Sequence, residues 1–308
     1  MSLYLKHRPK KLSEVVGNSD MLKSLTAVLD RGENRPHAYL LTGPTGCGKT
    51  TIGRIIAEHL RVNGSDFREV DSADFRGIDT IREMRSQSHY MALEGPNRMW
   101  LLDECHKMSN DAQNALLKAL EDTPPHVYYV LCTTDPQKLL GTIKGRCSHF
   151  QVDRLSDIDM RKLLTRVSKA EGENLAADVR SIIIDSAQGH PRNALQLLDQ
   201  VLSVEPDLRA EIARKAQEAT SQGIDLCRAL IGGEPWKKVA GILSDLKTQK
   251  KEAEEVRRMV MGYASAILLK GGENEAAANV LEEFRDPMWD VGFPGVVLAC
   301  YGVLFRKE

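Results

Sequence analysis

A glycine-rich stretch that ends in lysine and threonine carries the most specific chemical signal in this sequence. Residues 38–52 read AYLLTGPTGCGKTTI, and Gly43, Gly48, Lys49 and Thr50 match the spacing G-x-x-x-x-G-K-[ST]. Glycines let backbone N–H groups approach phosphate closely, the lysine reaches the outer phosphates, and the threonine hydroxyl is a ligand for Mg²⁺. The stretch therefore predicts a phosphate-binding loop for a nucleoside triphosphate with Mg²⁺.

An apolar strand before this loop and a helix after it are the elements expected to position it. The start of the helix directs its positive dipole end at the same phosphates. Further loop residues expected to contact the nucleotide are Thr45, Gly46, Cys47 (through its backbone) and Thr51.

Two carboxylates follow the apolar run at residues 98–102. We expect Asp103 to hold Mg²⁺ and Glu104 to polarise the attacking water. On their own, two acids at a strand end are equally typical of a solvated turn, but the phosphate-binding loop favours the functional interpretation. Thr133 and Thr134 end the next buried strand and are candidates to orient that water, although polar strand ends are common.

Three arginines are further candidates for binding anions. Arg192 follows Pro191 in the first turn of a predicted helix, where a cation opposes the helix dipole at a cost of about 0.3–1 kcal/mol. A bound triphosphate would reverse this penalty, whereas the alternative is an exposed arginine. Arg82 and Arg85 lie on neighbouring helical turns and suit a phosphate backbone, although spacing alone slightly favours a charged helix face.

Strands and helices alternate up to about residue 154, which predicts a parallel α/β sheet between layers of helices. Ligands of such sheets bind at the carboxyl ends of the strands. The expected strands cover 38–42, 67–70, 98–104, 127–134 and the region of 150–152, and the expected helices cover 19–30, 52–60, 78–90 and 111–121.

Beyond residue 155 only helical patterns remain. We expect a domain of residues 1–154, a three-helix domain of residues 155–205 and an all-helical domain of residues 206–308, with chain breaks at Gly223 and at Gly232-Gly233. The expected helices cover 157–171, 175–188, 191–201, 236–246, 253–269 and 291–305.

Composition excludes several classes of protein. The net charge of −1 over 308 residues argues against a general polyanion binder, so a nucleic-acid site would need a local lining of basic residues. The six cysteines form no C-x-x-C pair, which indicates neither a zinc module nor a disulfide framework. With no apolar run long enough for a membrane span and no signal peptide, we expect a cytoplasmic protein. The basic tract at residues 6–11 suits either a solvated surface or the edge of a nucleotide site.

Several longer motifs identify a family. They are YLKHRP with VVG, GPTGCGKT, SADFRGIDTIR, LLDECHKMSNDAQNALLKALEDTPPH, CTTDPQKL, GRC and GHPRNALQLLDQ. Together they span roughly residues 4–200, and in this order they resemble the AAA+ clamp-loader ATPase subunits, which include the bacterial DNA polymerase III gamma/tau subunit and the small subunits of replication factor C. The resemblance implies an AAA+ domain, a helical lid and a helical collar that mediates oligomerisation.

The resemblance also implies roles for single residues toward ATP. Arg8 and Val16 would border the adenine. Glu104 would be the catalytic Walker B glutamate after Asp103, with Lys49 and the sensor 1 residue Thr134 as further catalytic groups. Arg192 would be the sensor 2 residue that reaches the phosphates from the lid.

The resemblance also implies roles between molecules for three arginines. Arg146 occupies the place of the arginine finger, which acts on ATP held by a neighbouring subunit. Arg76 and Arg82 resemble residues that follow the DNA backbone. Gly145 departs from the family's usual serine beside the finger, no zinc module fits between His59 and Phe67, and the chain ends without the long tail of the tau form. These departures are those expected of a compact loader from a phage or a divergent bacterium.

The function implied is an ATP-driven subunit that opens a sliding clamp and loads it onto primed DNA. Its implied partners are the clamp, other loader subunits in a pentamer-type assembly and primer–template DNA, with neither a membrane nor zinc. One alternative is an AAA+ DNA motor, such as a helicase that migrates Holliday junctions, and the helical C-terminal region argues against it. The other is a structural loader subunit without hydrolysis, against which the intact Lys49, Glu104 and Arg146 argue.

Overall fold

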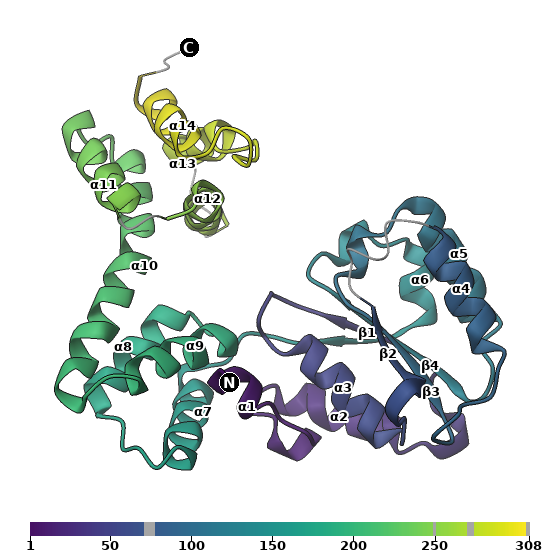
Figure 1. The fold of residues 1–308 in the computed structure, drawn as a ribbon. Coiled ribbons are helices and arrows are strands. Elements are labelled where there is room, and N and C mark those ends of the chain that lie inside the picture. The colour runs from purple at the N-terminus through teal and green to yellow at the C-terminus, as the bar shows by residue number, and fades with distance from the viewer. Residues whose placement is uncertain (71–77, 249–250, 270–273, 306–308) are drawn as a thin grey trace. The chain divides into compact units, whose positions relative to one another are not determined.

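The computed structural model describes residues 1–70, 78–248, 251–269 and 274–305, and the chain separates into two compact units, Met1–Arg209 and Ala210–Glu308 (Figure 1). The separation at Arg209 lies close to the boundary expected at residue 205, whereas the division into three domains remains a prediction. Within the ranges described, no helix has both the length and the apolar character needed to cross a membrane.

The first unit is built on a five-stranded parallel sheet, which confirms the α/β fold class. The strands have the order β2-β3-β4-β1-β5, and each neighbouring pair is parallel. Every residue of β1, β3 and β4 is buried, as expected for continuous apolar strands that helices cover on both faces. The strands are β1 (Ala38–Thr42), β2 (Phe67–Val70), β3 (Arg98–Leu102), β4 (Val127–Thr133) and β5 (Ser148–Gln151).

Alternate residues of the strands contribute to two hydrophobic cores, one on each face of the sheet. Tyr39 and Leu41 of β1 belong to the core under α2 and α3, while Leu40 belongs to the core under α4, α5 and α6. Figure 1 shows these two sets of helices on the sheet. Because all five strands are parallel, their carboxyl ends lie at one edge of the sheet. The helices on the sheet are α2 (Ser19–Leu29), α3 (Lys49–His59), α4 (Ile78–Ser88), α5 (Asn110–Glu121) and α6 (Gly141–Arg146).

Three helices follow the sheet, where the sequence predicts them. Ser156 caps α7 by accepting a hydrogen bond from the Asp159 N–H, and Pro191 occupies the first turn of α9, where its missing N–H costs nothing. The four-residue helix α1 packs against α9 and was not expected from the sequence. These helices are α1 (Leu3–Lys6), α7 (Asp157–Ala170), α8 (Ala177–Ala187) and α9 (Pro191–Leu202).

The second unit is helical throughout the residues described, and it corrects one expectation. Helix α10 runs straight through Gly223, so the predicted break there is wrong. A Cβ atom at Gly223 would lie 2.8 Å from Cε of Met259, so this glycine permits the close approach of α12 and does not end a helix. The helices are α10 (Arg209–Ile231), α11 (Trp236–Thr248), α12 (Ala253–Leu268), α13 (Glu275–Glu283) and α14 (Phe293–Phe305).

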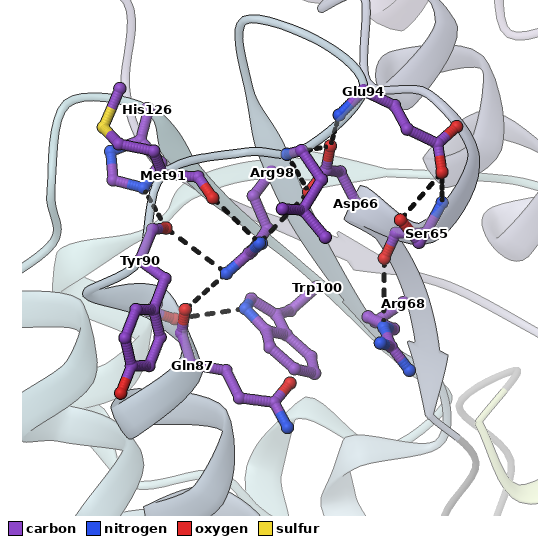
Figure 2. A network of polar contacts seen from close by, with 12 residues as sticks. Ser65, Asp66, Arg68, Gln87, Tyr90, Met91, Glu94, Arg98, Trp100 and His126 are labelled. Atoms are coloured by element: carbon purple, nitrogen blue, oxygen red, sulfur yellow. Dashed lines mark hydrogen bonds and ion pairs between the residues drawn. The ribbon is translucent and has the colours of Figure 1, made fainter.

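A buried ion pair fixes the amino edge of the sheet (Figure 2). Arg98, which begins β3, donates from Nη2 to Asp66 Oδ1 at 3.1 Å, and the two residues are 8% and 0% exposed. The same guanidinium donates to backbone carbonyls of Tyr90 and Met91, and Asp66 accepts the N–H of Leu93 at 2.8 Å. The loop after α4 is thereby fastened to the sheet at the edge opposite the phosphate-binding loop.

Candidate nucleotide-binding site

Two segments far apart in sequence meet at the carboxyl edge of the sheet. The phosphate-binding loop leaves β1, and the acid pair leaves β3, two strands away in the sheet. The hydroxyl of Thr50 donates a 2.6 Å hydrogen bond to Asp103 Oδ2. A cavity of 510 Å³ opens over this contact. Its lining consists of Arg8, Thr45, Gly46, Gly48, Lys49, Thr50, Thr51, Arg54, Glu69, Asp103, Glu104, Lys107 and Arg192.

The loop adopts a conformation that only glycine tolerates at its key positions. Gly43 has φ 141°, and a Cβ atom there would lie 2.0 Å from the carbonyl oxygen of Val152. Gly46 and Gly48 have φ 77° and 105°, which side chains disfavour. These conformations shape the loop that precedes the first turn of α3.

The side chain of Lys49 is positioned to bind a phosphate. Its side chain is buried, and Nζ donates to the carbonyls of Gly43 at 2.8 Å and Pro44 at 2.9 Å. An ammonium carries three protons, so a phosphate oxygen in the loop would accept the third. A buried cation with only neutral acceptors gains free energy from an anion beside it, and the lysine therefore fits a nucleotide phosphate.

The acid pair adopts a turn that the sequence does not reveal. Glu104 has φ 51°, an uncommon value for a residue other than glycine, and its N–H donates to Asp103 Oδ1 at 3.0 Å. Glu104 Oε2 lies 3.5 Å from the hydroxyl of Thr134, at the end of β4. The structure thus brings the predicted magnesium ligand, the predicted catalytic glutamate and the predicted sensor threonine together, while their roles remain predictions.

The start of α9 reaches the loop from the three-helix region. The Arg192 N–H donates to the carbonyl of Gly46 at 3.4 Å, and its guanidinium lies 5.9 Å from the ring centre of Tyr4. His190, which we did not predict, joins the same contact, with Nδ1 2.9 Å from the carbonyl oxygen of Thr45. Arg192 therefore lines the cavity, as a residue that reaches the phosphates must.

A second pocket beside the loop is mostly apolar and includes Arg8 and Val16. Burial lowers the pKa of Arg8, and the neighbouring charges of Arg54 and Arg192 add to this effect. An apolar pocket with a few polar groups suits a flat base such as adenine. Its other members include Val15, Cys47, Thr51, Ile52, Leu155, Leu163 and Leu195.

One ion pair in the cavity wall escaped the sequence analysis. Arg54 donates to Glu69 through Nε at 2.8 Å and Nη2 at 2.9 Å. Arg54 lies one helical turn beyond Thr50, on the same face of α3, which is a signal that helical spacing does contain. The partner in β2 could not be foreseen, because it depends on the order of the strands.

The remaining predicted arginines lie away from this cavity or outside the described residues. Arg146 ends α6, where it donates to the carbonyl of Thr142 at 3.1 Å and pairs with Glu121. Arg82 is exposed and pairs with Asp79 at 3.2 Å. Arg76 lies outside the residues that the structure describes. The structure therefore leaves the finger and DNA roles as predictions.

No set of three or more histidine, cysteine or acidic side chains among the described residues has the geometry to hold a metal ion. All six cysteines are free, and five of them are buried. The expected absence of zinc remains a prediction.

Comparisons with known proteins point to one family. Residues 61–156 match the family model for the DNA polymerase III delta subunit. The DNA polymerase III subunit gamma/tau of Mycobacterium bovis is 35% identical over 237 residues, which cover 70% of this chain and 41% of that protein. Subunit tau of Bacillus subtilis is 34% identical over 72% of this chain and 43% of its own length, and subunit gamma of Buchnera aphidicola is 33% identical over 64% and 60%. The chain thus spans less than two thirds of these relatives.

Solved structures support the fold. The RuvB Holliday junction branch migration motor of Thermotoga maritima has a TM-score of 0.62 at 20% identity, over 73% of this chain and 79% of its own. A DNA polymerase III gamma subunit-related protein of the same organism has a TM-score of 0.54 at 18% identity and covers 94% of this chain and 100% of its own. At these identities the likeness shows an AAA+ fold with helical domains. Together with the sequence matches, it confirms the predicted resemblance: the chain is similar to the AAA+ clamp-loader subunits of the DNA polymerase III gamma/tau type.

Proposed function

We propose that this chain is an ATP-hydrolysing clamp-loader subunit that helps to open a sliding clamp and load it onto primed DNA. The observation that carries the proposal is the 2.6 Å contact between Thr50 and Asp103, which joins the phosphate-binding loop to the acid pair in one cavity. The names of the relatives that are 33–35% identical supply the replication context. Because the chain spans only part of those relatives, the activity of the whole protein is part of the proposal.

The residues of this chain divide the chemistry between them. Lys49 and the loop N–H groups would bind the β- and γ-phosphates, and Thr50 with Asp103 would hold Mg²⁺, whose charge would offset that of the phosphates. Glu104 accepts a proton from the attacking water. The water oxygen forms a bond to the γ-phosphorus, while the bond from that phosphorus to the leaving ADP oxygen breaks. Thr134 orients the water beside this carboxylate.

Two further groups would act between molecules. Arg146 does not line the cavity of its own subunit, so a finger at this position would serve a neighbour. Arg82, on the exposed face of α4, would release its partner Asp79 and contact a DNA phosphate. Replacement of Arg82 by alanine should weaken binding to all primed sequences alike, with a salt slope smaller by about one. An unchanged slope would assign Arg82 to a solvated helix face.

The test is a loading assay on the full chain with the proteins that copurify with it from its native cell. A labelled clamp should become topologically linked to primed circular DNA only with ATP, and Lys49→Ala should abolish linkage. Lys23→Ala is the matched control, because Lys23 is an exposed lysine that pairs with Asp20, one turn away on α2. Movement of Holliday junctions without a clamp would instead support the branch-migration alternative.

A further inference from the structure

A histidine beside the acid pair is oriented by contacts at both ring nitrogens. His106 lies in the turn that follows β3, and its side chain is only 10% exposed. Nδ1 is 3.0 Å from the hydroxyl oxygen of Thr133 on β4, and Nε2 is 3.6 Å from Glu104 Oε2. The ring therefore bridges the ends of two neighbouring strands at the edge where hydrolysis is proposed to occur.

Thr133 and Glu104 together favour one tautomer of the ring, and Thr133 contributes to this as a hydrogen-bond donor. Its oxygen already accepts the N–H of Asp135 at 3.0 Å, and its hydroxyl hydrogen is available to Nδ1 of His106. That leaves the ring proton on Nε2, which faces Glu104. The opposite tautomer would direct a nitrogen lone pair at a carboxylate oxygen, and the two would repel each other.

The surroundings of the ring favour its neutral form. Burial lowers the pKa of His106, and the nearby charges of Lys138 and Lys107 act in the same direction. Glu104 and Asp135 act against them, without reversing the shift. A neutral ring with its proton on Nε2 can donate to Glu104 without neutralising the negative charge that a base requires.

We propose that His106 is a positioning residue for Glu104. Its Nε2–H and the hydroxyl of Thr134 both face Oε2 of the carboxylate, which leaves Oε1 to accept the proton of the attacking water. The separation of 3.6 Å is longer than a hydrogen bond, so the contact acts as a directed electrostatic restraint. The restraint matters because Glu104 extends from an uncommon backbone conformation, φ 51°, that does not by itself fix the carboxylate. This inference rests on the proposed role of Glu104.

The first test measures the tautomer and needs no activity. In the full chain labelled with ¹⁵N-histidine, the His106 signals, assigned with His106→Gln, should show a neutral ring protonated on Nε2 at pH 7.5. Thr133→Val, which removes the donor to Nδ1, should weaken this preference, whereas Thr133→Ser should keep it. A ring protonated on Nδ1, or on both nitrogens, would overturn the proposal.

The second test measures ATP turnover and ATP affinity in the assembled loader. His106→Ala should lower kcat by about 10- to 100-fold, by analogy with the loss of a residue that orients a metal ligand, with the Kd for ATP unchanged. His106→Gln, which keeps a donor, should recover part of the loss. In a Glu104→Gln background, His106→Ala should have no further effect.

The matched control is His37→Ala. His37 is also half-buried, with Nδ1 2.8 Å from the carbonyl oxygen of Val127, but it lies at the other edge of the sheet. If His106→Ala lowers kcat no more than His37→Ala does, while Glu104→Gln is inactive, His106 has no positioning role. If Glu104→Gln keeps wild-type turnover, the proposed role of Glu104 is wrong, and the role of His106 that rests on it is wrong as well.

Discussion

The hydroxyl of Thr50 and the carboxylate of Asp103 are joined by a 2.6 Å hydrogen bond, although 53 residues separate them in the sequence. Thr50 lies in the first turn of α3 after the phosphate-binding loop, and Asp103 follows β3. Both are oxygen groups of the kind that Mg²⁺ prefers, and each already faces the other. The site therefore needs little rearrangement to receive Mg²⁺ with its nucleotide.

The first prediction concerns this pair. Thr50→Val should weaken ATP binding in the presence of Mg²⁺ more than binding in EDTA, because the variant keeps the loop but loses a metal ligand. Isothermal titration with and without Mg²⁺ measures the difference. Thr51→Val is the matched control: Thr51 also lines the cavity, and any loss of ATP binding on its replacement should be the same with and without Mg²⁺. Equal losses under both conditions would show that Thr50 acts only as a phosphate contact.

The second prediction separates binding from hydrolysis. Lys49→Ala should abolish tight ATP binding, because the buried ammonium is the loop's own cation. Glu104→Gln should bind ATP normally and hydrolyse it about 10²–10⁴-fold more slowly, the usual range for losing a general base. Single-turnover measurements on the assembled protein give both quantities. Near-wild-type hydrolysis by Glu104→Gln would remove that residue from its proposed role.

Much of the fold follows from local sequence. The parallel sheet, the P-loop helix and the three helices after β5 all follow from apolar runs and 3.6-residue periodicity. Helix α13 escaped prediction because its nine residues are too few to show a clear period. The error at Gly223 has a different cause, because a close approach between helices requires a glycine that local sequence cannot distinguish from one that ends a helix.

The residues of the site likewise divide into those that local sequence predicts and those that it does not. The loop and the acid pair could be predicted, since each is contiguous and has fixed spacing. The pair of Arg54 and Glu69 and the bridge through His106 could not, because both depend on which strands become neighbours. Neither the uncommon backbone angle of Glu104 nor its contact with Thr134 leaves a signature in the residue types.

The third prediction concerns the buried ion pair at the amino edge of the sheet. Asp66→Ala should destabilise the first unit by about 3–5 kcal/mol, because Arg98 is left buried without its counter-ion. The pKa of the Asp66 carboxyl is already lowered: burial opposes the shift, but the N–H groups of Glu94 and Leu93 and the guanidinium of Arg98 outweigh it. Urea denaturation followed by far-UV circular dichroism measures the loss.

The control for this prediction is Asp20→Ala, which removes an exposed partner of Lys23 on α2. Exposed ion pairs contribute about 0–1 kcal/mol to stability, so the free energy of unfolding of this variant should be close to that of the wild type. If the two aspartate variants were equally stable, the buried pair would contribute nothing beyond a surface pair.

The fourth prediction is a pH dependence in the second unit. Hydrogen bonds from Arg257 lower the pKa of Glu254 to about 2, against the effect of burial, with the Met288 N–H and Arg258 adding to the shift. A lowered pKa means that the unfolded chain binds the proton more readily. The stabilisation, about 3 kcal/mol by this shift, is therefore complete above pH 4.5 and is lost as the pH falls toward 2.

The comparison with Glu254→Gln makes this measurable. The difference in free energy of unfolding between wild type and variant should be largest at neutral pH and shrink between pH 4.5 and 2. Glu234→Gln, in an exposed pair with Lys238, should show a small difference throughout. A gap between wild type and Glu254→Gln that stays constant with pH would contradict the assigned pairing.

The last prediction is that Arg146 acts on ATP held by a neighbouring subunit. It ends α6, away from the cavity of its own subunit, and its partners there are Glu121 and the carbonyl of Thr142. At 37% side-chain exposure it remains accessible to another molecule. Its permanent charge and planar fork suit two phosphate oxygens as negative charge develops, and a finger supplied by another chain contributes about 10³–10⁵ in rate. Arg146→Ala should therefore bind ATP but hydrolyse it very slowly in the assembly.

Complementation distinguishes action between subunits from action within one. Lys49→Ala still offers a finger and Arg146→Ala still offers a nucleotide site, so a mixture of the two inactive variants should recover part of the ATPase activity. A head-to-tail interface permits this exchange, because each subunit gives one surface and receives the other. Lys144→Ala is the matched control, as a basic residue on the same short helix. Mixed assemblies that form without recovering activity would place the action of Arg146 within its own subunit, and normal hydrolysis by Arg146→Ala would end its role as a finger.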